Sequence, residues 1–78
     1  MRNLTDLALG EGGTVRCLRA SGGMGRRLMD LGFTAGARVE CLLSAPGGGM
    51  RAYRVRRAVI ALRKKDARTV ILEDSSHE

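Results

Sequence analysis

Apolar residues recur at helical spacing in one segment of the chain. Met24, Leu28 and Leu31 stand at positions i, i+4 and i+7, which places them on one face of a helix. Ser21, Gly22 and Gly23 precede this stripe and open the helix. The pattern predicts a helix over residues 23–31.

The sequence also predicts where this helix ends. Gly32 follows directly and suits the left-handed position that ends many helices. Phe33 then stands where a Schellman motif packs an apolar residue back on Leu28. We therefore expect Phe33 in the core with the helix stripe of Met24, Leu28 and Leu31.

Most of the remaining chain consists of short segments in which apolar and polar residues alternate between glycine-rich turns. This pattern is typical of β-strands. The predicted strands are residues 14–19, 37–44, 50–55, 59–62 and 69–72, and residues 63–67 are predicted to form one helical turn.

Two of these strands carry specific predictions. In the first, Val15 and Leu18 fall on opposite faces unless a β-bulge intervenes. In the second, Val39, Cys41 and Leu43 share one face, which makes Cys41 a buried small hydrophobe rather than a metal ligand.

The two ends of the chain are predicted to be simpler. Leu4 to Leu7 form one short turn, capped by Thr5 or Asp6, and residues 10–13 form a loop turn. Residues 74–78 are predicted to be a flexible tail. The whole pattern favours a mainly β fold: a small barrel or sandwich of about five strands with one inserted α-helix and a short C-terminal helical turn.

Composition narrows the class of protein. The 78 residues are enough for one domain only, and the charged fraction of 28% is ordinary for a globular chain. Two cysteines cannot supply a disulfide scaffold. The first twenty residues show no secretory signal, and the longest apolar run, residues 58–62, is too short to span a bilayer. We expect a soluble, cytoplasmic protein.

Candidate chemistry is sparse, and we expect no enzyme. The single histidine, His77, lies in the predicted tail, and the acidic residues form no pair. No cofactor site is evident. The one metal-binding prediction is a weak, unselective divalent site in which the tail gathers a transition metal ion through Glu73, Asp74, His77 and Glu78.

Basic residues are concentrated in one stretch. Residues 51–68 carry a net charge of +7, whereas the whole chain carries +6. Such a stripe can contact nucleic acid, an anionic membrane or an acidic protein, or it can be a solvated face. Since Tyr53 is the only aromatic residue beside it, we expect no specific nucleic-acid recognition.

Several segments together resemble the FeoA family, the small cytoplasmic component of bacterial ferrous iron transport. The resemblance is carried by Leu4-Thr5-Asp6-Leu7, by Arg26-Arg27-Leu28-Met29-Asp30-Leu31-Gly32-Phe33-Thr34, by Val39-Glu40-Cys41-Leu42, by Tyr53-Arg54-Val55-Arg56 and by Ile60 to Ala67. The chain departs from the family at Ala35, where proline is usual, and at Arg57, where glycine is usual. Because a tight hairpin would strain a non-glycine residue, we expect a wider turn at Arg57.

The resemblance implies an SH3-like barrel over residues 1–73. It also implies the partner, a FeoB-type membrane iron permease with a cytosolic GTPase domain, on which this chain would act as an accessory protein near the inner membrane. The same fold serves as a regulatory domain in iron-dependent repressors, and family members are commonly described as binding transition metals.

The leading hypothesis is therefore docking on the permease. The expected contact residues are Arg26, Arg27 and Met29, followed by Arg51, Tyr53 and Arg54. The alternatives are a metal-responsive regulatory or nucleic-acid-associated module, and a homo-oligomer formed through exposed edge strands.

Overall fold

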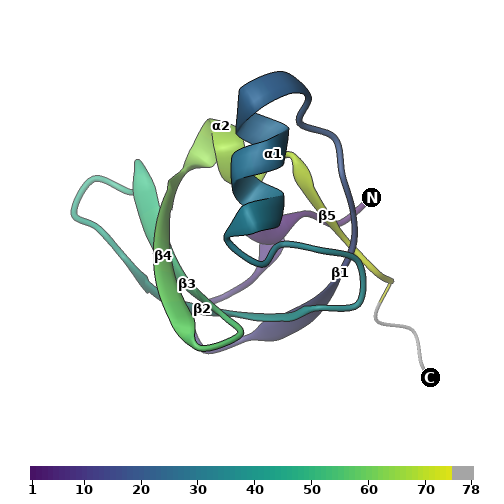
Figure 1. Cartoon of the computed structure of the whole chain (residues 1–78). Coiled ribbons are helices and arrows are strands. Elements are labelled where there is room, and N and C mark those ends of the chain that lie inside the picture. The colour runs from purple at the N-terminus through teal and green to yellow at the C-terminus, as the bar shows by residue number, and fades with distance from the viewer. Residues whose placement is uncertain (75–78) are drawn as a thin grey trace.

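The computed structural model describes residues 1–74 and is shown in Figure 1. Within this range the chain forms five strands, two α-helices and one 3-10 helix. In chain order they are η1 (Leu4–Asp6), β1 (Gly12–Leu18), α1 (Gly22–Asp30), β2 (Arg38–Ser44), β3 (Met50–Val55), β4 (Ala58–Arg63), α2 (Lys64–Ala67) and β5 (Val70–Leu72). This is the mainly β composition that the sequence predicts, with the inserted helix and the helical turn at the expected places.

The strands form one antiparallel sheet in the order β4-β3-β2-β1-β5. The sheet curls strongly, and α2 connects its two edge strands, so that the sheet nearly closes on itself (Figure 1). None of the helices within the described residues is long and apolar enough to cross a membrane.

The core fills the inside of the curled sheet. Its fully buried side chains come from η1, from α1, from four of the strands and from connecting segments. They are Leu4, Leu7, Val15, Leu28, Phe33, Val39, Cys41, Tyr53, Val55, Val70 and Leu72. Both aromatic residues of the chain are among them. The core is therefore aliphatic around two central rings, and Cys41 is the buried small hydrophobe that the alternation predicts.

Irregularities in the strands decide which apolar residues stay outside. The expected bulge in β1 is present, between Val15 and Cys17. A second bulge, which the sequence pattern does not predict, shifts the register between Cys41 and Leu43. It turns Leu43 outward, where 57% of the residue is exposed, so the prediction that Leu43 shares the buried face is wrong.

The end of α1 confirms the predicted Schellman motif. Gly32 has a φ of 112°, its N–H donates to the Met29 carbonyl, and the Phe33 N–H donates to the Leu28 carbonyl at 3.0 Å. Leu28 and Phe33 are fully buried as expected. Met24 is 39% exposed, so its assignment to the core is wrong. It lies in the first turn of the helix and lines a surface groove.

The turn between β3 and β4 contradicts the wider turn that was expected. Val55 pairs directly with Ala58, which leaves a two-residue loop of Arg56 and Arg57. The left-handed conformation falls on Arg56, with a φ of 55°, and not on Arg57. Within residues 1–74, one non-glycine residue has a positive φ, and it is Arg56. This conformation disfavours a side chain.

The N-terminal cap also differs from the prediction. Asn3, not Thr5 or Asp6, caps η1, because its side chain accepts the Thr5 N–H at 2.9 Å while Asp6 accepts the Asn3 N–H. The two residues form a capping box. Of the predicted tail, residues 75–78 lie outside the described residues.

Replacing Gly32 by alanine should destabilise the fold by about 1–3 kcal/mol, because the alanine would have to adopt a positive φ that disfavours a side chain. The added Cβ would also lie 3.2 Å from Cδ of Arg56. Urea unfolding measures the change. The matched control is Gly49→Ala, where a Cβ meets nothing within 4 Å, and its free energy of unfolding should stay within about 0.5 kcal/mol of the parent. Equal losses in both variants would contradict this role of Gly32.

Candidate functional site

Three of the six expected contact residues lie together on the outer surface of α1. Arg26, Arg27 and Met29 are all exposed, and Met29 is 55% exposed. Leu28, between them, is fully buried in the core and fixes the rotation of the helix. The helix thus presents two guanidinium groups and one thioether to the outside.

A groove runs along one side of α1. Its volume is about 800 Å³, and its lining includes Arg16, Leu18, Ala20, Arg26, Met29 and Asp30. Two positive charges, one negative charge and apolar surface therefore lie side by side. Gly25 allows α1 to approach the backbone at Ala20 closely, since a Cβ on residue 25 would lie 2.7 Å from the Ala20 carbonyl oxygen.

A smaller groove runs along the other side of the helix. It has a volume of about 340 Å³, and Met24, Arg27, Met50, Arg63, Lys65 and Asp66 contribute to its lining. Met24 and Met50 are both partly exposed there. Flexible thioethers beside cationic side chains are typical of surfaces that adapt to a protein partner.

Arg51 and Tyr53, two further expected contact residues, turn out to serve the fold. Tyr53 is fully buried, so its ring cannot contact a partner and that prediction is wrong. Its hydroxyl donates to the Leu4 carbonyl at 3.4 Å, and Nη1 of Arg51 donates to the Leu7 carbonyl at 2.7 Å. Both side chains of β3 therefore hold the N-terminal segment.

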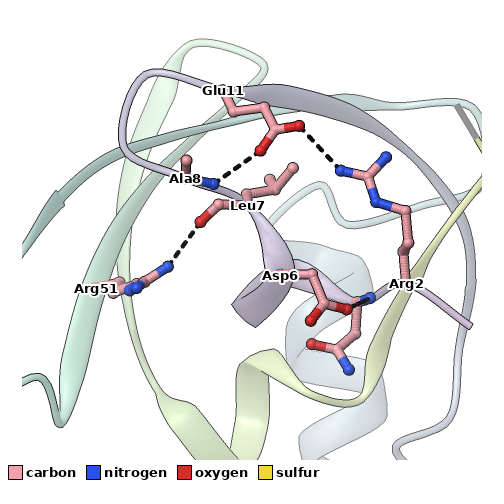
Figure 2. A network of polar contacts seen from close by, with 7 residues as sticks. Arg2, Asp6, Leu7, Ala8, Glu11 and Arg51 are labelled. Atoms are coloured by element: carbon pink, nitrogen blue, oxygen red, sulfur yellow. Dashed lines mark hydrogen bonds and ion pairs between the residues drawn. The ribbon is translucent and has the colours of Figure 1, made fainter.

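The same segment is held by a second set of polar contacts, which Figure 2 shows together with Arg51. Oε1 of Glu11 accepts the Ala8 N–H at 2.8 Å, and its Oε2 pairs with Arg2 at 3.1 Å. Close by, the Asp6 carboxylate accepts the Asn3 N–H at 2.9 Å, as part of the capping box. These charges satisfy backbone groups near the chain start, so they belong to the scaffold rather than to a binding site.

Burial raises the pKa of the Tyr53 hydroxyl above its usual value near 10, and the neighbouring Cys41 thiol adds to this shift. Arg51 opposes it through its charge and a hydrogen bond. The phenol stays protonated over the physiological range and acts as a hydrogen-bond donor.

Arg54, the last expected contact residue, is exposed but lies away from α1. It pairs with Glu40 at 3.2 Å and lines a groove of about 550 Å³ with Arg38 and Arg56. Sequence reasoning missed Arg38 and Arg56. The sequence places Arg38 and Glu40 on one face of their strand. Their position beside Arg54 and Arg56 depends on the register that pairs Glu40 with Arg54, and the structure supplies that register.

Metal ligands are not brought together in the part of the chain that the structure describes. No group of three or more histidine, cysteine or acidic residues occurs within residues 1–74. Cys17 is exposed and Cys41 buried, both as free thiols. Of the predicted tail site, His77 and Glu78 lie outside the described residues.

Comparison with known proteins gives one family. The family model described as FeoA domain matches residues 2–74. No curated protein matches significantly.

Among solved structures, FeoA of Stenotrophomonas maltophilia complexed with zinc is 28% identical, with a TM-score of 0.85, and the match covers 94% of this chain and 91% of that one. It is described as a prokaryotic SH3 domain protein and a candidate activating factor of ferrous iron transport. FeoA of Chlorobium tepidum is 26% identical, with a TM-score of 0.88 and coverage of 99% and 73%.

A manganese-dependent transcriptional repressor shares the fold, with 24% identity, a TM-score of 0.77 and coverage of 92% of this chain and 41% of that one. These likenesses confirm the predicted SH3-like barrel.

The raised pKa of Tyr53 predicts a pH dependence of stability. The unfolded tyrosine loses its proton near pH 10 while the folded one still holds it, so the free energy of unfolding should fall as pH rises above about 10. Tyr53→Phe should cost about 0.5–1.5 kcal/mol at neutral pH and should remove this part of the alkaline loss. Urea unfolding of both proteins from neutral pH to about pH 11 tests it, and parallel stability curves would contradict the assignment.

Proposed function

This chain belongs to the FeoA family, and from this premise we propose that it is an accessory protein of bacterial ferrous iron uptake. In this proposal it works in the cytoplasm and docks on the cytosolic GTPase part of a FeoB-type iron permease. The support is the family match over residues 2–74, combined with the exposed Arg26, Arg27 and Met29 on a helix whose inner side is locked in the core.

The docking surface would be the outside of α1 and the grooves beside it. The two arginines offer guanidinium groups to carboxylates of a partner, and Met29 offers an adaptable apolar contact. The net charge of +6 would favour encounter with an acidic surface. Because Leu28 and Phe33 anchor the helix, the contact would form without prior rearrangement of this chain.

Zinc is present in the structure of one relative. Within residues 1–74 no cluster of three suitable ligands exists, and Cys41 is buried among apolar side chains. In the proposed docking, ferrous iron is the cargo of the permease.

A regulatory or nucleic-acid-associated module is the second candidate. It is favoured by the fold shared with a manganese-dependent repressor and by the basic stretch of residues 51–68. A nucleic-acid partner would show affinity that falls steeply with salt. The same titration, with duplex DNA as a second ligand, separates the two candidates.

Reversing two charges on α1 should weaken docking. Arg26→Glu combined with Arg27→Glu should reduce affinity for the GTPase domain of the same organism's permease by about tenfold or more, because acidic partner groups would then face like charges. Isothermal titration at two salt concentrations measures this, and the variant should unfold like the parent since both residues are exposed.

The matched control is Arg57→Glu combined with Arg68→Glu, which changes the net charge equally at exposed positions that line neither groove beside α1. Its affinity should stay within about threefold of the parent. Equal weakening by both double variants, or binding to DNA alone, would overturn the proposed docking surface.

A further inference from the structure

Three arginines border a groove to which α1 contributes no residue. Arg38 comes from β2, Arg54 from β3 and Arg56 from the β3–β4 turn, and the groove they line has a volume of about 550 Å³. No residue of α1 lines it. Its position is therefore independent of the proposed docking helix.

Two of the three arginines have no acidic partner in the groove. Arg38 donates to the Thr14 hydroxyl at 3.3 Å, and Arg56 donates to the Thr34 hydroxyl at 2.9 Å. Both acceptors are neutral, so they orient the guanidinium groups without neutralising them. A guanidinium carries five N–H donors, which leaves most of these donors for a ligand.

Arg54 already holds a carboxylate. Its Nη1 lies 3.2 Å from Oε1 of Glu40, and both side chains are about half exposed. Glu40 is the acid among the residues that line this groove. The pair shows that a carboxylate fits between these strands, and the partial exposure makes it weak enough to exchange.

The backbone at Arg56 is held in an unfavourable conformation. Its φ of 55° is one that glycine adopts freely, and its side chain extends over Gly32, where a Cβ would lie 3.2 Å from Cδ of Arg56. Residues kept in such conformations concentrate at functional sites. Here the strained residue supplies one of the three guanidinium groups.

The groove suits carboxylates better than phosphates. Phosphate sites usually add free backbone N–H groups. Two of the three glycine amides that line the groove are already engaged, since Gly10 donates to the Cys41 carbonyl at 2.6 Å and Gly36 donates to the Val15 carbonyl at 2.8 Å. The guanidinium fork matches carboxylates and phosphates alike, so the preference rests on the Glu40 carboxylate that Arg54 already holds.

We propose that this groove binds an acidic protein segment with carboxylates spaced along an extended chain. Arg38 and Arg56 hold the segment from the two sides, while its carboxylate displaces Glu40 from Arg54. Glu40 thus acts as an internal competitor that keeps the groove closed to weakly acidic segments.

Fluorescence anisotropy with a labelled peptide of alternating aspartate and glycine tests the site. Arg56→Gly removes the guanidinium and suits the local φ, so it should weaken binding about threefold to fivefold while the protein stays folded. Arg38→Gln should weaken it similarly without touching the turn. Glu40→Gln frees Arg54 and should strengthen binding by about threefold.

Arg57→Gly is the matched control, because it removes the same charge from the same turn but from a residue that does not line the groove. Its affinity should change by about twofold or less. Equal losses in Arg56→Gly and Arg57→Gly would reduce the effect to net charge and overturn the site. Tighter binding of pyrophosphate or duplex DNA through Arg56, or weaker peptide binding by Glu40→Gln, would overturn it as well.

Discussion

The chain reversal after α1 is the constraint on which the rest of this structure depends. Gly32 takes the left-handed conformation, so that the Phe33 N–H can return to the Leu28 carbonyl and both side chains can enter the core. Once Leu28 is buried, the rotation of the helix is fixed, and the charged residues next to it must face outward. The same turn supports the stem of Arg56, so one glycine positions residues of two separate grooves.

A second constraint acts at the start of the chain. The N-terminal segment has little secondary structure of its own, and its carbonyl groups are held by Arg51 and Tyr53 of β3. Arg51 and Tyr53 thus stabilise the fold, although the basic character of their strand suggests a binding surface. What remains for a partner is set by geometry: the outside of α1 with its flanking grooves, and the arginine-lined groove on another side of the barrel.

Local signals predicted most of the fold, while the expected contact residues divide between the surface, where Arg26, Arg27, Met29 and Arg54 are exposed, and the scaffold, which holds Arg51 and Tyr53. The strands, the helix and its C-terminal motif follow from alternation, helical spacing and one glycine. Leu43 was misplaced because a bulge resets the alternation, and the turn at Arg56 was misjudged because the strained residue is not the one where glycine is usual. Tyr53 is an expected contact residue by its place in the basic stretch, but the structure encloses its side chain fully. Such effects arise from tertiary packing, which a single sequence does not display.

The central claim is that the outer face of α1 meets the GTPase part of the permease. NMR spectra of the isotopically labelled chain, recorded with increasing amounts of that domain, test it most directly. The account predicts that amide shifts concentrate in Gly22–Asp30 and in the groove residues beside Arg16. Shifts confined to the β3–β4 turn and Arg38, or no shifts at saturating partner, would contradict it.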